Sequence, residues 1–174
     1  MDHPIPGKKA SESRVQLAQL MQPQHANNHG NVHGGWIMMF MDEAGALACM
    51  RHAQSRVVTV AVDRMTFHRP IRLGDLVTFS AEVSYVGRTS MEAQVDVVAE
   101  NPVTGECVYT NTAFYVYVAL GEHDKPVVVP PLIPENEAQA ARMEEGRLRQ
   151  EQRLAKSRLE RASKDQPCEG RRHG

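Results

Sequence analysis

Residues 33–50 read HGGWIMMFMDEAGALACM, an apolar run interrupted by one acidic pair, Asp42 and Glu43. A helix that is apolar on every side is a buried helix, and this one is too short and too charged to span a bilayer. Its small residues, Gly34 and Gly35 among them, would let another backbone come close. We therefore expect a central helix with a sheet wrapped around it.

Five further segments carry the β-branched or alternating pattern of strands. They lie before and after the apolar run, at residues 14–21, 57–67, 76–86, 90–100 and 106–118. The last four are joined mostly by short turns, which favour antiparallel pairing. The order of one strand, a helix and four strands predicts an α+β fold, in which an antiparallel sheet is wrapped around one long central helix.

The regions outside this core differ from it in composition. We expect a flexible N-terminus at residues 1–12, one domain at 13–120 and an extended, proline-rich linker at 121–134. Residues 135–163, rich in Glu, Ala, Gln, Arg and Leu, predict a charged C-terminal helix, followed by a disordered tail at 164–174. We expect a solvated helix that lies against the oligomer. A nucleic-acid-binding arm is the alternative, disfavoured because Glu alternates with Arg.

Composition indicates the class of protein and disfavours some partners. The chain has 174 residues, of which 41% are hydrophobic and 24% charged, as is usual for a soluble globular protein. Its net charge of -1 gives no reason to expect nucleic acid or an anionic membrane as the main partner. The first residues lack the apolar run of a secretory signal. The three cysteines, odd in number and scattered, fit a reducing cytoplasm, so we predict a cytoplasmic protein.

A carboxylate inside an apolar helix is costly unless it is paired or neutralised, so Asp42 and Glu43 are candidates for chemistry. The helix start at Gly34 and Gly35 offers free backbone N–H groups, which can stabilise negative charge on a substrate carbonyl. A nearby carboxylate can deprotonate water or attack directly, and the carboxamide of Asn27 can orient water or hold the carbonyl. The alternative is structural: the glycines permit close packing, and Asp42 is a core carboxylate satisfied by hydrogen bonds.

The loop, the helix and the later strands together resemble one family over about residues 14–120. The segments that carry the resemblance read ANNHGNVHGG at 26–35, MDEAG at 41–45, RH at 51–52, VTVAVD at 58–63, FH at 67–68, SME at 90–92 and YVAL at 117–120. This combination is similar to the hotdog-fold acyl-CoA thioesterases, in particular the cytosolic long-chain (brain-type) acyl-CoA hydrolase group. The resemblance implies a hotdog fold and hydrolysis of fatty acyl-CoA to free acid and CoA. No cofactor is expected, since CoA is part of the substrate and product.

The same resemblance implies a catalytic pair. In that family it is an Asn in the loop and an Asp on the helix, which match Asn27 and Asp42, with the Gly35 N–H as the oxyanion site. Animal members have two fused domains that each keep one of the pair, whereas this chain has both residues in one domain. A homodimer is therefore implied, with Asn27 from one subunit and Asp42 from the other in each site, commonly built into a trimer of dimers. Whether Asp42 acts as base or nucleophile stays open.

CoA carries phosphates, so its binding groove should present basic side chains, hydroxyls or backbone donors. The predicted substrate-binding residues are Arg88, Thr89 and Ser90 at a tight turn, Arg64, His68 and Arg69 around the end of the central strand, Thr59 and Val60 on that strand, and His33 and Gly34 at the helix start.

Two other functions stay open as alternatives. A hotdog enoyl-thioester hydratase or dehydratase would use a histidine base, and His33 lies near the helix start. A non-catalytic acyl-CoA-binding protein would bind CoA tightly without turnover. His25, His29 and His33 recur every fourth residue, but their loop is rich in Asn and Gly and is not helical. We therefore predict no metal site.

Overall fold

The computed structural model describes residues 5–164, except for the side chains of Arg64 and of residues 161–164. Its helices, short 3-10 helices (η) and strands follow in the order β1 (Lys8–Lys9), η1 (Ala10–Ser13), β2 (Val15–Leu20), η2 (Pro23–His25), α1 (Gly34–Ala53), β3 (Arg56–Phe67), β4 (Leu76–Val86), β5 (Ser90–Glu100), β6 (Cys107–Leu120), η3 (Glu122–Asp124), β7 (Leu132–Ile133) and α2 (Glu137–Lys164). In this range, neither α-helix has the length and hydropathy needed to cross a membrane.

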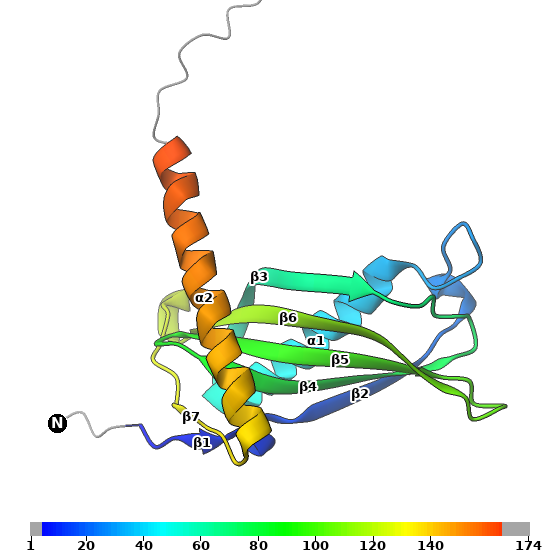
Figure 1. Ribbon diagram of the computed structural model, residues 1–174, viewed down its shortest axis with the longest axis horizontal. Helices are drawn as coiled ribbons and strands as arrows, with labels where there is room; N and C mark the ends of the chain where they lie inside the picture. The colour runs from blue at the N-terminus through cyan, green and yellow to red at the C-terminus, as the bar shows by residue number, and fades with distance from the viewer. Residues whose placement is uncertain (1–4, 165–174) are drawn as a thin grey trace, which may run out of the picture.

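Five antiparallel strands form one curled sheet in the order β2-β4-β5-β6-β3, and α1 packs against one face of it (Figure 1). Alternation along each strand directs one set of side chains to the helix. On β4, for example, Val77, Phe79 and Val83 are at most 1% exposed, and they belong to one core cluster with Ile37 and Met41 of α1. The predicted α+β fold, a central helix wrapped by an antiparallel sheet, is confirmed.

The helix α1 has an open side that the sequence pattern does not predict. Met38, Met39 and Leu47 remain 42%, 39% and 41% exposed, so the prediction of burial on every side is wrong. The sheet does not close around the helix, since β2 and β3 are its two edges and are not paired with each other. The open side of α1 therefore lies between two free strand edges.

The N-terminal segment and the linker are more regular than predicted. A flexible N-terminus is predicted for residues 1–12, but in the structure residues 8–12 belong to β1 and η1. The strand β1 pairs in parallel with β7, which lies inside the predicted linker. Ser13 is fully buried, and its Oγ accepts a hydrogen bond from the Val83 N–H at 2.9 Å. These contacts join residues far apart in sequence, which is why local composition does not reveal them. Of the disordered tail predicted for residues 164–174, residue 164 is the last residue of α2, and residues 165–174 lie outside the described part of the chain.

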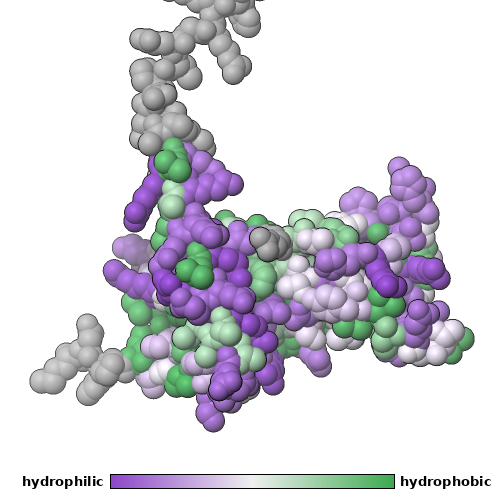
Figure 2. Space-filling view, viewed as in Figure 1, coloured by the Kyte–Doolittle hydropathy of each residue, from purple (hydrophilic) through white to green (hydrophobic). Residues whose placement is uncertain are grey.

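The helix α2 crosses the opposite face of the sheet from α1, and its outward surface is mostly hydrophilic (Figures 1 and 2). Charged contacts hold it there, since Arg149 Nη2 and Arg153 Nη1 donate to Glu92, whose side chain is fully buried, at 2.8 and 3.0 Å. Gly146 permits the close approach, because a Cβ at this position would lie 2.5 Å from the Cβ of Tyr85. The helix predicted to be solvated and to lie against the oligomer thus packs on the sheet of its own chain, where its arginines contact the buried carboxylate of Glu92.

His52 gives the fold a specific dependence on pH. The residue is 1% exposed, its Nε2 donates to the Pro130 carbonyl at 2.8 Å, and burial lowers its pKa below the ordinary value. As pH falls from about 7 to about 5, the unfolded chain gains this proton before the folded one does, so the free energy of unfolding should decrease. The contribution of this one group is up to about 1.4 kcal/mol per pH unit.

The variant His52→Gln keeps a donor for Pro130 and cannot titrate. We expect its stability to fall less than that of the wild type between about pH 7 and about pH 5, as measured by urea unfolding. The same pH dependence in both proteins would show that folding does not lower the pKa of His52.

Candidate active site

Asp42 lies on α1, and two hydroxyl groups hold its carboxylate. Thr59 Oγ1 donates to Asp42 Oδ1 at 2.7 Å, and the Tyr117 hydroxyl donates to the same oxygen at 3.1 Å and to the Asp42 carbonyl at 2.9 Å. Both side-chain contacts use Oδ1, and Oδ2 accepts no hydrogen bond from the described part of the chain. The residue is only half-buried, so the carboxylate is not sealed inside the core.

A β-bulge positions Thr59 beside this carboxylate. On β3, Thr59 pairs with Tyr117 of β6, but the next matched residues are Ala61 and Val116, so Val60 is an extra residue in the ladder. The side chain of Val60 is 55% exposed on the edge of the sheet. Thr59 and Val60 are among the predicted substrate-binding residues. The structure instead gives the Thr59 hydroxyl a partner within the protein, Asp42.

Asn27 lies in a different part of the same chain. Its Oδ1 accepts hydrogen bonds from the N–H groups of His29 (2.8 Å) and Asn31 (3.2 Å), which closes the loop. Because two N–H groups donate to this atom, it is the carbonyl oxygen of the side chain, and the other terminal atom is the amide nitrogen Nδ2. Nδ2 donates to no group among the described residues. Asn27 lines a cavity of about 320 Å³ together with Gly34, Phe67, His68 and Arg69. The structure thus places three predicted binding residues beside Asn27.

One chain does not bring Asn27 and Asp42 together. Asp42 follows Gly34 by eight residues in the helix, which at about 1.5 Å per residue places it roughly 12 Å further along the axis. Thr59 and Tyr117 surround Asp42 at this position, and Asn27 is not among its hydrogen-bond partners. The two predicted catalytic residues therefore lie at separate places in the single chain.

The start of α1 is capped by a side chain. The Gly35 N–H donates to His33 Nδ1 at 2.9 Å, so the prediction that this N–H is free is wrong for this structure. The contact fixes the neutral tautomer of His33, with its proton on Nε2. A substrate carbonyl has to displace the imidazole before it can accept from Gly35.

The remaining predicted basic residues lie at separate places. Arg88 is exposed in the turn between β4 and β5, which the Gly87 N–H closes by donating to the Ser90 carbonyl at 2.8 Å, with Thr89 between them. Ser90 pairs with Val118, the residue that also pairs with Val58, so this turn is near the β3 residues around Thr59. His68 and Arg69 lie instead beside Asn27, and the side chain of Arg64 is outside the described part of the structure.

Burial keeps the other reactive groups near Asp42 protonated. It raises the pKa of the Tyr117 and Tyr115 hydroxyls, with the charge of Asp42 as a further cause, so both remain hydrogen-bond donors. It also raises the pKa of the Cys49 thiol, which favours a core role for that residue over nucleophilic catalysis. Within residues 5–164, no three His, Cys, Asp or Glu side chains gather in a group that could hold a metal ion.

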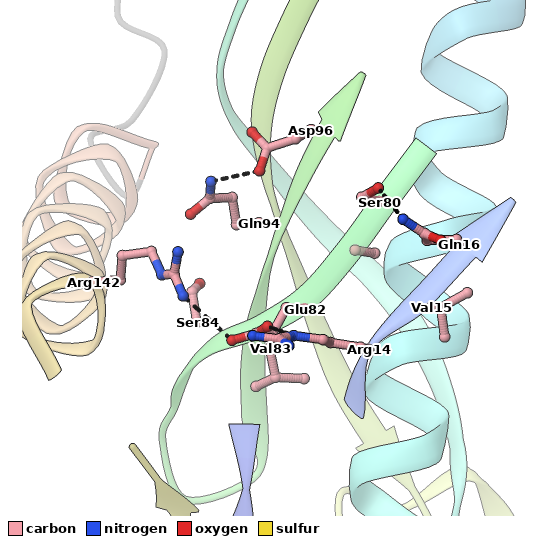
Figure 3. Close-up of a pocket in the computed structure, with 11 residues that line it drawn as sticks. Arg14, Val15, Gln16, Ser80, Glu82, Val83, Ser84, Gln94, Asp96 and Arg142 are labelled. Carbon is pink, nitrogen blue, oxygen red and sulfur yellow. Dashed lines mark hydrogen bonds and ion pairs between the residues drawn. The ribbon is translucent and has the colours of Figure 1, made fainter. Parts of the chain in front are cut away.

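A larger cavity, of about 560 Å³, lies on the outer face of the sheet beside α2 (Figure 3). Its charged residues contact one another: Glu82 forms ion pairs with Arg14 and Arg142, and Asp96 accepts from Gln94 at 2.8 Å. None of the predicted site residues is among those that line it. Since these polar groups already have partners, the groove is not the candidate active site.

Tyr117 and Gly45 are not among the site residues predicted from the sequence. A Cβ at Gly45 would lie 2.5 Å from the Tyr117 hydroxyl oxygen, so the glycine gives that hydroxyl its place beside Asp42. Tyr115 and Tyr117 alternate on β6, which predicts that both face the same side of the sheet. Which residues of α1 they reach depends on strand register, which the sequence alone does not provide.

A long helix packed against one face of a curled antiparallel sheet, with a half-buried carboxylate on the helix, defines a hotdog-fold protein of the thioesterase type. The chain belongs to the thioesterase superfamily, whose family model matches residues 29–106. Over 148 residues it is 38% identical to the cytosolic acyl coenzyme A thioester hydrolase of Rattus norvegicus. That match covers 84% of this chain and 39% of the rat protein, so the chain spans about two fifths of the length of this relative.

Solved structures agree with this assignment. An acyl-CoA hydrolase from Staphylococcus aureus, in complex with butyryl-CoA, CoA and CoA disulfide, is similar with a TM-score of 0.83 and 31% identity, over 91% of this chain and 96% of that one. Three variants of that enzyme have also been solved, in which an aspartate, an asparagine or a threonine is replaced by alanine. A hexameric thioesterase from Yersinia pestis is 37% identical, with a TM-score of 0.62 over 66% of this chain and 93% of that one. The predicted family and the hotdog fold are confirmed.

Proposed function

We propose that this protein hydrolyses acyl-CoA thioesters to free acid and CoA, in an active site shared by two copies of the chain. The observation that carries the proposal is the Asp42 carboxylate, held through Oδ1 by the Thr59 and Tyr117 hydroxyls, while Oδ2 accepts no hydrogen bond from the described residues. The aspartate, asparagine and threonine replaced in the S. aureus variants are spaced along that chain as Asp42, Asn27 and Thr59 are here.

The chemistry needs few groups. As a general base, Asp42 takes a proton from water while the water oxygen attacks the thioester carbonyl. As a nucleophile, Asp42 attacks that carbon itself and forms a mixed anhydride, which water then hydrolyses to release the acid and restore the carboxylate. In both routes the carbon–sulfur bond breaks, and CoA leaves as a thiolate with little help, because the thiol has a pKa near 8.5. Donors at the Asn27 amide and, once the His33 imidazole has moved, at the Gly35 N–H stabilise the charge on the carbonyl oxygen.

A second subunit completes the site. The apolar residues Val58, Val60 and Val62 are exposed along β3, an edge strand, and Met38 and Met39 are exposed on α1. Pairing two such edges would cover this surface, and two-fold symmetry would create two equivalent sites. In each site, Asp42 faces Asn27 of the partner subunit. Three such dimers make a hexamer, the state of the Y. pestis relative.

The CoA moiety extends from this site toward basic and hydroxyl groups. We assign the phosphates to the turn at Arg88, Thr89 and Ser90, which lies near the β3 residues around Thr59. His68 and Arg69, which line the cavity beside Asn27, serve as secondary contacts. Catalysis uses no cofactor in this scheme. We also propose that the protein acts in the cytoplasm, because its rat relative is named a cytosolic enzyme.

Arg88→Ala tests the assignment of the phosphates. We expect the KM for acyl-CoA to rise about tenfold while kcat changes little, because a charge-assisted contact to a phosphate acts on the substrate and the transition state alike. The matched control is Arg147→Ala, which removes a partly exposed arginine that pairs with Glu144 and Glu151 on α2. An unchanged KM for Arg88→Ala rejects this role.

The activity itself is tested with a panel of acyl-CoA esters from short to long chains, with the released CoA detected by a thiol reagent. We expect release of one CoA for each acid formed. Absence of CoA release across the panel would contradict the proposal. Turnover of an enoyl-CoA to its hydrated product without CoA release would assign the protein to the hydratase class instead.

A further inference from the structure

Tyr117 is a fully buried residue whose hydroxyl reaches the half-buried carboxylate of Asp42. The side chain is 0% exposed, and its single hydroxyl proton is shared between the Asp42 carbonyl (2.9 Å) and Asp42 Oδ1 (3.1 Å). Burial of a tyrosine hydroxyl is favourable only when it has a partner. Here the partner is the proposed catalytic residue itself.

The helix is shaped to admit this hydroxyl. Gly45 lies on the turn of α1 that follows Asp42, and a Cβ there would lie 2.5 Å from the hydroxyl oxygen and 3.2 Å from two ring carbons of Tyr117. A glycine in the middle of a helix is destabilising relative to alanine. The space that Gly45 leaves is occupied by the Tyr117 hydroxyl, which gives this cost a structural reason.

The two hydroxyls that hold Asp42 differ in their surroundings. Thr59 lies on the edge strand β3 and is exposed in the single chain, whereas Tyr117 lies on β6, between β5 and β3, and is enclosed. The contact from Tyr117 is therefore internal to one subunit. It does not require the proposed second copy.

We infer that Tyr117 is a positioning residue for hydrolysis, which fixes Asp42 Oδ1 and so presents Oδ2 to the substrate. The inference rests on the proposed function. Because hydroxyls from two strands hold Oδ1, rotation of the carboxylate is restricted. The reacting oxygen, Oδ2, is therefore held in one orientation. Loss of the hydroxyl should leave substrate binding intact and reduce the fraction of bound substrate that meets a correctly oriented carboxylate.

Tyr115 provides a matched control within the same structure. Its ring stacks on that of Tyr117, with centroids 6.4 Å apart, and its hydroxyl donates to the Met38 carbonyl at 3.0 Å, one turn earlier on α1. Tyr115→Phe thus removes the same atom from the same interface between β6 and α1, without touching a carboxylate. Any difference between the two variants belongs to the contact with Asp42.

The experiment measures kcat and KM for an acyl-CoA that the wild type hydrolyses, together with the thermal midpoint of each protein. For Tyr117→Phe, we expect kcat to fall about 10- to 100-fold with KM within about twofold of wild type, the size expected for one hydrogen bond to a charged group. For Tyr115→Phe, we expect both constants to stay within about threefold.

Gly45→Ala approaches the same contact from the helix. We expect a loss of kcat like that of Tyr117→Phe, and a combined variant that loses less than the product of the two, because both changes act on one hydroxyl. Equal effects of Tyr117→Phe and Tyr115→Phe on kcat, or a loss that appears in KM, would overturn the inference and leave the proposed function standing. A wild-type protein without turnover would remove both.

Discussion

Asp42→Asn is expected to lower the kcat for acyl-CoA hydrolysis by roughly a thousandfold, while KM changes little. A carboxamide is neither a base nor a nucleophile at neutral pH, so both routes proposed for Asp42 are lost with the same substitution. The replacement has the same shape, and its Oδ1 still accepts hydrogen bonds from Thr59 and Tyr117. The fold should therefore remain intact, which a thermal midpoint close to wild type would verify.

The adjacent residue supplies the control for this experiment. Glu43 is exposed and points about 100° away around α1. Glu43→Gln makes the same chemical change on the same helix, and we expect its kcat to stay within about twofold of wild type, as is usual for a surface substitution. Near-normal CoA release from Asp42→Asn, measured with a thiol reagent, would remove this carboxylate from the mechanism.

Local patterns in the sequence are sufficient to predict the core of the fold. The apolar run at 33–50 becomes α1 at Gly34–Ala53, and the alternating segments at 76–86 and 90–100 coincide with β4 and β5. These elements could be predicted because periodicity is a local property, set by which side chains must face the core. The family resemblance added what periodicity does not provide, namely which residues to propose for a chemical role.

The contacts that depend on strand register could not be predicted in this way. Nothing in the sequence near Thr59 or Tyr117 indicates that both side chains meet at Asp42, because the meeting point depends on a bulge at Val60. The pairing of β1 with β7 escapes prediction for the same reason. Nor does an apolar helix reveal what covers it. The exposed Met38 is equally compatible, from sequence, with burial by its own sheet or by a second subunit.

Asn27→Asp is expected to lower kcat by about a hundredfold or more, the loss typical of removing one donor to an oxyanion. The variant keeps Oδ1, which accepts from His29 and Asn31, and so keeps the loop closed, but it replaces the amide donor by a negative oxygen. Asn27→Ala removes the donor as well, but it also opens the loop. Comparable losses in kcat, with reduced thermal stability only in Asn27→Ala, would separate the donor role from the loop contacts. Full activity of Asn27→Asp would contradict the donor role.

Mixing the two inactive variants tests whether the active site is shared between subunits. Chains with Asn27→Asp and chains with Asp42→Asn, co-expressed and randomly paired, form mixed dimers in which one site has both substitutions and the other has neither. We expect about a quarter of the wild-type activity to return, since half of the dimers are mixed and each has one intact site. If the two residues acted within one chain, every chain in the mixture would be defective and no activity would return. Recovery therefore depends on Asp42 facing the partner subunit's Asn27, which is the central element of the proposed mechanism.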